Sequence, residues 1–213
     1  MLSFFFMSLQ EAVPVVFIGK LNDVQMLAGI GLGNMVVNLL PFALMIGVNT
    51  ALETLVSQAF GRKNLRDCGL YLHRASFVIT VLFLVLIPIL FNTENALVAM
   101  GMDPMASKHT QIFIKYAAPG LYLNSISDSL DLFLSGMNKI GVGAKIQGLM
   151  LLLQVFACWL FIEKLDLGIM GAGLAKTTTS TIDIILVMVY ISRQKEIAES
   201  WYFPTKQTFS NLG

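Results

Sequence analysis

The sequence predicts an all-α integral membrane protein: a bundle of six transmembrane helices followed by a short tail. Its 213 residues are 56% hydrophobic and only 13% charged, whereas a soluble domain carries about 25% charged residues. The mean hydropathy is +0.74, so there is too little polar surface to cover a globule in water. The apolar runs are separated by short polar turns, and a run of about 20 apolar residues spans a bilayer as a helix.

The first helix is expected over residues 1–18, which is barely long enough to span. Its apolar run is interrupted by Glu11 and Pro14. It also lacks the basic leading region and the small-residue cleavage site of a signal peptide. We therefore interpret it as a membrane helix rather than as a targeting segment.

The second helix is expected over residues 24–59, which is too long for one perpendicular crossing. Pro41 should bend it, because proline removes a backbone donor and crowds the preceding turn. Gly29 and Gly33 form a Gly-xxx-Gly pair. Such a pair predicts that a neighbouring helix approaches closely at this point.

Four further helices and a tail complete the expected order. The run from Ala75 to Phe91 contains no charge, which marks the third helix. Polar residues between Asn92 and Pro104 predict a connection, and Lys139–Lys145 predicts a basic, glycine-rich turn. The helices are expected over residues 69–91, 111–137, 146–162 and 168–191, and a cytoplasmic tail over 193–213.

Positive charge is distributed unevenly among the connections. The connections after the first, third and fifth helices hold Lys20, Lys108 and Lys164. Those after the second and fourth helices, together with the tail, hold Arg62, Lys63, Arg66, Arg74, Lys139, Lys145, Arg193, Lys195 and Lys206. This bias of nine against three places the second set in the cytoplasm by the positive-inside rule. Both termini are then cytoplasmic, as six crossings require.

Ionisable residues inside membrane helices are informative, because an unpaired charge in hydrocarbon costs at least about 2.5 kcal/mol. On the fourth helix, Asn124, Asp128 and Asp131 fall on one face with Ser135. Two carboxylates one turn apart repel, and burial adds to that, so the pattern predicts a proton- or cation-responsive site. The alternative is that Asp131 reaches the cytoplasmic interface while Asp128 pairs with a neighbouring helix.

The sixth helix has a second polar face, formed by Lys176, Thr179, Ser180 and Asp183. Lys176 and Asp183 lie about 10 Å apart along the axis, so hydroxyl or water bridging is expected rather than a direct bond. A structural salt bridge is the simpler interpretation, an ion pathway is the other, and Lys176 is near enough to the outer end to snorkel.

Three runs of the sequence, taken together, resemble the multidrug and toxic compound extrusion (MATE) family. The first is FIGKL at Phe17–Leu21 followed by LAGIGLGN at Leu27–Asn34. The second is ALETLVSQAFG at Ala51–Gly61, which is similar to the end of that family's second helix. The third is LDLGIMGAGLA at Leu165–Ala175, which is similar to the entry into its sixth helix. The three runs occur in the order and at the separations of that family's first lobe.

The resemblance implies candidate site residues as well as a fold. Glu53 and Gln58 lie in the matching second run, although Glu53 could instead anchor the neighbouring basic loop. The family often places asparagines near Gln154 and Cys158, and its prokaryotic branch an aspartate near Pro14. Because this chain departs from those patterns, sodium coupling is less expected than proton coupling. The family has no paired aspartates that match Asp128 and Asp131.

The expected function is a MATE-type secondary antiporter, or half of one, that extrudes xenobiotic or organic cations in exchange for protons. The alternative is a truncated or assembly-only membrane lobe without transport activity of its own. No nucleophile–base pair, metal triad or phosphate-binding loop is present in the sequence, so neither an enzyme nor a cofactor is expected. The net charge of +1 gives no reason to expect nucleic acid. The expected partners are the bilayer, a drug-like cation, a proton, and a second lobe or a second copy, because that family packs two six-helix lobes around one cavity.

Overall fold

The computed structural model describes residues 2–194, and this part of the chain is helical with no β-strand. The expected tail therefore lies outside the described residues from position 195 onward. The α-helices are α1 Leu2–Gly19, α2 Val24–Val37, α3 Ala43–Gly61, α4 Leu65–Phe91, α5 Thr93–Ala99, α6 Pro104–Gly136, α7 Ile140–Cys158 and α8 Gly168–Arg193, with π-helical turns η1 Asn38–Phe42 and η2 Trp159–Lys164.

Side-chain caps mark where several helices begin. Asp23 accepts hydrogen bonds from the backbone N–H groups of Gln25 and Met26 at the start of α2. Asp103 accepts one from Ala106 at the start of α6, directly before Pro104. Aspartate at the N-cap satisfies donors that have no partner within the helix, and proline fits the first helical position.

The helix bounds differ from the expected ones in the second half of the chain. The connection expected between Asn92 and Pro104 contains the short helix α5, and α6 begins at Pro104 rather than at residue 111. Lys139–Lys145 is not a turn, because α7 already begins at Ile140. The turn is made instead by Asn138, whose φ is 61°. Glycines at 141 and 143 suggested a turn, but Val142 and Ile146 in the first two turns of α7 pack against the core, and this packing overrides the weak helix propensity of glycine.

The irregularity expected at Pro41 is a π-helical turn rather than a break. The chain runs from α2 through η1 into α3, and Pro41 lies within η1. A π turn shifts the hydrogen-bond ladder by one residue and so accommodates the missing proline donor.

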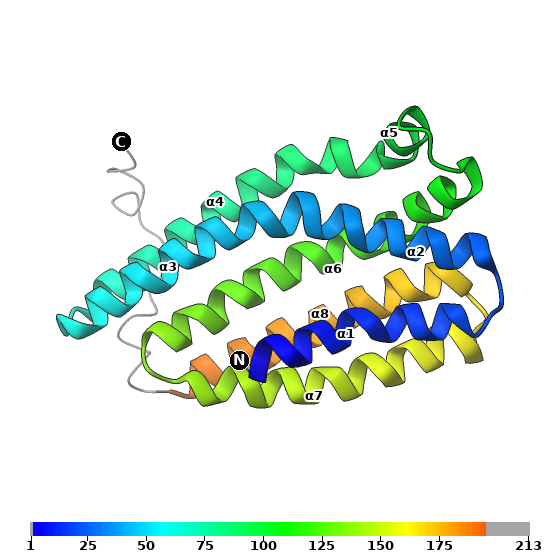
Figure 1. Ribbon diagram of the computed structural model, residues 1–213. Helices are drawn as coiled ribbons and strands as arrows, with labels where there is room; N and C mark the ends of the chain where they lie inside the picture. Colours follow the sequence, from blue (N-terminus) through cyan, green and yellow to red (C-terminus); the bar gives the residue numbers. More distant parts are fainter. Residues whose placement is uncertain (1, 195–213) are drawn as a thin grey trace.

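The long helices lie side by side in one bundle (Figure 1). The α3–α4 and α6–α7 turns lie at one end of the bundle, whereas the α1–α2 and α7–α8 connections and α5 lie at the other. At this second end an ion pair of 3.1 Å joins Lys20 to Glu163. The basic connections predicted to share one membrane surface thus share one end of the molecule.

Glycines allow α6 to approach its neighbours closely. A Cβ atom at Gly29 would lie 2.6 Å from the His109 Cβ, and one at Gly33 would lie 2.5 Å from the Phe113 ring. The close approach predicted from the Gly-xxx-Gly pair is therefore confirmed, with α6 as the partner. On the other side of α6, a Cβ at Gly173 of α8 would lie 2.8 Å from the Tyr116 Cβ.

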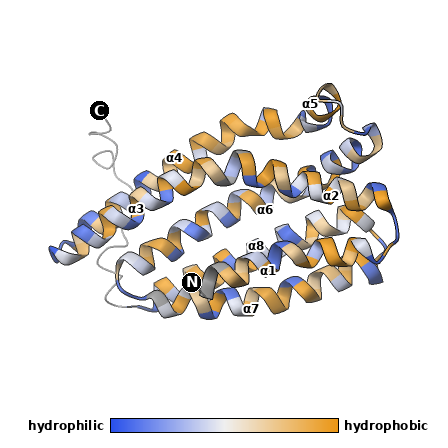
Figure 2. Cartoon of the chain, in the orientation of Figure 1, coloured by the Kyte–Doolittle hydropathy of each residue, from blue (hydrophilic) through white to orange (hydrophobic). Residues whose placement is uncertain are grey.

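The long helices consist largely of hydrophobic residues (Figure 2), and many large apolar side chains are exposed on the outside of the bundle. Leu152 and Val85, for example, are 68% and 64% exposed. By length and composition, three helices of the described chain can cross a membrane: Leu65–Phe91, Gly141–Lys164 and Gly168–Arg193. Phe5–Gly19 and Val24–Val37 are apolar but shorter. Six crossings therefore remain a prediction.

Candidate functional site

Two small cavities with polar linings lie inside the bundle. They share Gln10 of α1, Asn124 of α6 and Lys176 of α8. Their volumes are about 10 Å³ and 70 Å³. The smaller is lined by Gln10, Asn124, Met150, Gln154, Lys176, Thr179, Ser180 and Asp183. The larger, whose lining also includes apolar side chains, adds Asp128 of α6 and Gln147 of α7, together with Glu11 of α1, Asn38 of η1 and Asn49 of α3.

Helices α6 and α8 run parallel, and a threonine sets their register. The Thr177 hydroxyl donates to the Tyr116 carbonyl at 2.6 Å, and the Gly120 N–H donates to the Thr177 hydroxyl at 3.2 Å. Two turns further along, the same register brings Ser127 to Asp183. Thr177 and Ser127 lie outside the polar faces predicted for these two helices. Of the predicted α6 face, Asn124 borders the smaller cavity together with Lys176 and Asp183.

Asp183 is the most deeply buried carboxylate of the site, with 4% of its surface exposed. Its Oδ2 accepts a hydrogen bond of 2.7 Å from the Ser127 hydroxyl. Its Oδ1 is buried and has no hydrogen-bond partner. A buried carboxylate oxygen without a donor is costly in free energy and can accept a proton or a cation.

The two aspartates of α6 have different partners. Asp128 Oδ2 accepts from the Asn124 amide at 3.0 Å and faces the larger cavity. Asp131 Oδ2 accepts from the Gln147 amide of α7 at 3.3 Å, while its Oδ1 has no partner. Gln147 in turn accepts from the Gln10 amide at 3.0 Å. Asp131 is therefore tied to α7 and α1, and the charges of Asp131 and Asp183 both act on Asp128.

Lys176 is the cation of the site. It is half-buried, lines both cavities and lies within electrostatic range of Asp128 and Asp183. Within the described chain it makes neither a hydrogen bond nor an ion pair shorter than 4.0 Å with either carboxylate. This agrees with the separation of about 10 Å expected along the helix axis.

The remaining predicted residues lie elsewhere in the molecule, with one exception. Glu53 accepts a 2.9 Å hydrogen bond from the Ser135 hydroxyl and lines neither cavity. Gln58 is exposed on the last turns of α3. Gln154 is the exception: it is 1% exposed, lines the smaller cavity, and donates to the Cys158 sulfur at 3.5 Å.

Three residues that line the cavities were not predicted from the sequence: Gln10 and Glu11 of α1 and Asn38 of η1. Gln10 and Glu11 lie in the middle of an apolar run, and Asn38 begins the π turn. The Asn38 amide donates to Glu11 at 3.4 Å. An isolated polar residue in a membrane helix is a usable signal, because such residues usually face the bundle interior.

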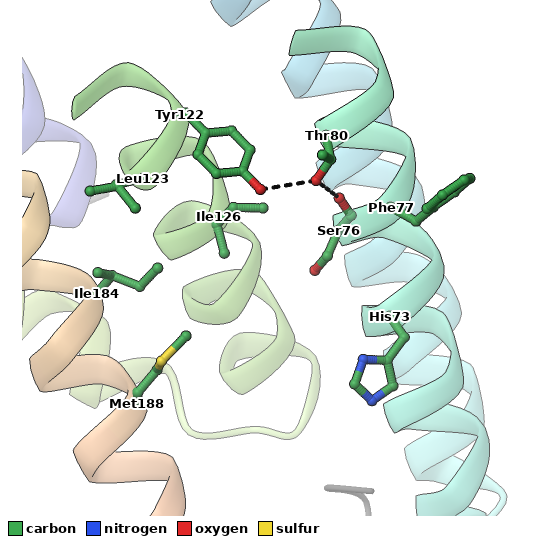
Figure 3. A pocket seen from close by; sticks show the side chains of 9 residues that line it. All are labelled: His73, Ser76, Phe77, Thr80, Tyr122, Leu123, Ile126, Ile184 and Met188. Atoms are coloured by element: carbon green, nitrogen blue, oxygen red, sulfur yellow. Dashed lines mark hydrogen bonds between the residues drawn. The ribbon is translucent and has the colours of Figure 1, made fainter. Parts of the chain in front are cut away.

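A larger cavity of about 380 Å³ lies apart from these residues, between α4, α6 and α8 (Figure 3). The Tyr122 and Thr80 hydroxyls are 3.0 Å apart on its wall. Phe77 and Met188 at its edge are 46% and 43% exposed. None of the predicted site residues lines it.

An apolar helical bundle around buried carboxylates is typical of membrane transport proteins. A family model described as MatE matches residues 1–160. The chain therefore belongs to the MATE family of transporters, and the resemblance found in the sequence is confirmed.

Curated relatives come from plants and animals. Protein DETOXIFICATION 17 from Arabidopsis thaliana is 29% identical over 95% of this chain and 42% of its own length. Protein DETOXIFICATION 31 from the same plant is 31% identical over 94% of this chain and 38% of its own length. Multidrug and toxin extrusion protein 1 from Oryctolagus cuniculus is 28% identical over 89% of this chain and 33% of its own length. The chain thus spans less than half the length of these relatives.

Solved structures show the same fold. The eukaryotic MATE transporter AtDTX14 superposes with a TM-score of 0.87 at 21% identity, over 96% of this chain and 45% of that chain. The Vibrio cholerae MATE transporter VcmN in the bent form superposes with a TM-score of 0.81 at 17% identity, over 97% of this chain and 47% of that chain. The described bundle corresponds to about half of each transporter.

Proposed function

We propose that this chain is one lobe of a secondary antiporter that extrudes organic, drug-like cations in exchange for protons. Relatives named for detoxification and for multidrug and toxin extrusion support the substrate class. The proposed protein crosses the membrane six times, with both termini and the Arg62–Arg66 turn in the cytoplasm, because the basic connections lie at one end of the bundle.

The observation that carries this proposal is the carboxylate-lined interior. Asp128 and Asp183 border cavities with polar side chains, inside a bundle that exposes many large apolar side chains. Such carboxylates favour cations and protons over neutral molecules, and they destabilise the bundle unless one of these is bound. Exchange of a proton for a cation at such a position is the chemistry that an antiporter needs.

Coupling to protons rather than sodium rests on the side chains around Asp183. Gln154 and Cys158 occupy the positions at which the family often has asparagines, and they bond to each other. Pro14 stands near the position of the first-helix aspartate of the prokaryotic branch. The Cys158 thiol offers no oxygen ligand to a hard cation such as Na⁺, so this departure favours a proton over a metal ion.

A single lobe does not provide alternating access, which needs two bundles that move against each other around a shared site. The chain spans 42% of Protein DETOXIFICATION 17. We therefore propose that it transports only when it is paired with a second lobe, either a different bundle or a second copy of itself.

Reconstitution into liposomes tests both parts of the proposal. The purified chain is inserted alone, and together with the C-terminal half of Protein DETOXIFICATION 17 as the second lobe. Ethidium efflux is followed with and without an imposed proton gradient, and light scattering in detergent gives the oligomeric state. We expect gradient-driven efflux from the paired lobes or from a homodimer, and none from a monomer.

Efflux from a verified monomer would contradict the need for a second lobe. Stable pairs that bind but do not move ethidium would instead favour the alternative, a lobe that assembles without transporting. A sodium gradient that drives efflux as well as a proton gradient would contradict the proposed coupling.

A further inference from the structure

The two small cavities are lined by more acidic than basic side chains. Of the described residues that line them, Glu11, Asp128 and Asp183 are acidic and Lys176 alone is basic. Asp131 is a fourth carboxylate nearby, within electrostatic range of Asp128 and Asp183. In a low-dielectric interior this excess of negative charge needs cations or protons nearby.

Lys176 is placed to supply one of these cations from within the protein. It lines the smaller cavity together with Asp183 and the larger cavity together with Asp128. Neither carboxylate holds its ammonium group in a direct bond. The lysine side chain has four methylene groups, so the ammonium group can move between the two cavities while its backbone stays fixed.

The smaller cavity also has features of a binding site for a small cation. Its volume of about 10 Å³ is close to that of one water-sized sphere. The unpartnered Oδ1 belongs to Asp183, which is 4% exposed and lines this cavity. Neutral oxygens from Asn124, Gln154 and Thr179 are available to a cation, because the amide and hydroxyl groups of these residues act as donors in their hydrogen bonds.

We propose that the Lys176 ammonium group is the built-in counter-ion of this site and keeps small metal cations such as Na⁺ away from Asp183. The two positive charges repel over a short distance in a poorly screened interior, so binding of Na⁺ requires the ammonium group to withdraw. Without the lysine charge, Asp183 and its neutral oxygen neighbours form a site of the kind that hard cations prefer. The idea deepens the proposed function by giving its proton preference a cause.

Sodium binding to the full chain in detergent tests this directly, with ²²Na⁺ as the probe. We expect no saturable binding to the wild type and saturable binding to Lys176→Met. In that variant, NaCl should also raise the Tm by about 3 °C relative to choline chloride, whose cation is too large to enter. Lys176→Arg keeps the charge and should behave as the wild type does.

Two further variants locate the effect. Lys115→Met removes an exposed charge from α6 and should bind no sodium. Lys176→Met combined with Asp183→Asn should lose the sodium binding gained by Lys176→Met alone. If Lys176→Met does not fold, Lys176→Gln carries the same expectation, because it also removes the charge.

Equal sodium binding by the wild type and by the charge-removed variant would overturn the proposal, and so would its absence from both. Sodium binding that persists in the Asp183→Asn combination would also overturn it. Because the readout is binding rather than efflux, failure here leaves the transport proposal standing, and failure of transport leaves this result interpretable.

Discussion

Serine side chains on α6 join this helix to the polar groups of its neighbours. Ser127 donates to Asp183, Ser129 donates to Asn49 at 2.8 Å, and Ser135 donates to Glu53. In a bilayer there is no water to replace such partners, so each bond matters more than its net strength in water indicates. The polar face of α6 is thus a set of cross-helix bonds as well as a candidate ion pathway.

Removing one of these hydroxyls should destabilise the bundle. Ser127→Ala leaves the buried Asp183 carboxylate without its donor, and we expect a loss of about 1–3 kcal/mol in the free energy of unfolding. Denaturation by SDS, followed by circular dichroism, measures this loss. Ser192→Ala is the matched control, because that hydroxyl is exposed and bonds only within its own helix; equal losses in the two variants would contradict the argument.

Neutralising Asp128 should reduce transport without unfolding the protein. Asparagine has the same shape, but it cannot exchange a proton, so we expect gradient-driven ethidium efflux by the paired lobes to fall by about tenfold or more. Asp166→Asn is the control: Asp166 is exposed and has a φ of 50°, which asparagine tolerates. Unchanged efflux and pH dependence in Asp128→Asn would remove this residue from the proposed pathway.

At the scale of helices, close packing depends on a few glycines as well as on the buried apolar side chains. The backbones of α2 and α8 reach α6 through Gly29, Gly33, Gly120 and Gly173. Small residues stabilise helix pairs in membranes because lipid gives no hydrophobic drive for helices to associate. The π turn η1 has a related effect, since it sets the direction in which α3 continues after α2.

Adding one methyl group should therefore have opposite effects at two glycines. In Gly173→Ala the new Cβ would lie 2.8 Å from the Tyr116 Cβ and 2.9 Å from the Phe113 carbonyl oxygen. We expect a destabilisation of about 1–3 kcal/mol by the same SDS measurement. Gly31→Ala meets no atom within 4 Å, so it should be neutral or stabilising by up to about 1 kcal/mol. The reverse order would show that α6 and α8 are not packed as described.

At the scale of the whole molecule, the two ends of the bundle differ in charge. The α3–α4 turn carries Arg62 and Lys63, and Arg66 follows at the start of α4, whereas the opposite end holds the Lys20–Glu163 ion pair. Because cations are retained on the cytoplasmic side during insertion, this asymmetry predicts one orientation for the entire bundle.

Cysteine labelling of intact cells measures that orientation. Arg62→Cys should react with a membrane-impermeant maleimide only after the cells are permeabilised. Met100→Cys, an exposed residue just after α5 at the opposite end, should react without permeabilisation. The native Cys68 and Cys158 are buried and give little background. Labelling of Arg62→Cys from outside would reverse the proposed topology.

The sequence by itself determined the helical membrane class, the family and the uneven distribution of positive charge among the connections. These follow from local features: hydropathy over a run of residues, the spacing of glycines, and the sign of charge in each connection. The Gly29–Gly33 contact was predictable for the same reason, since one short motif specifies it. The ends of the helices were less predictable from the sequence. Gly141 and Gly143 suggest a turn locally, but they lie at the start of α7, where Val142 and Ile146 pack against the core.

Only the tertiary structure decided which polar residues meet. It places Asp183 against Ser127 rather than against Lys176, and it brings Gln10 of α1 to Gln147 of α7. It also separates Glu53 and Gln58 from the cavities that Asp128, Gln154 and Lys176 line. Such pairings depend on the rotation and register of each helix, which backbone contacts set over many residues, and no single stretch of sequence contains that information.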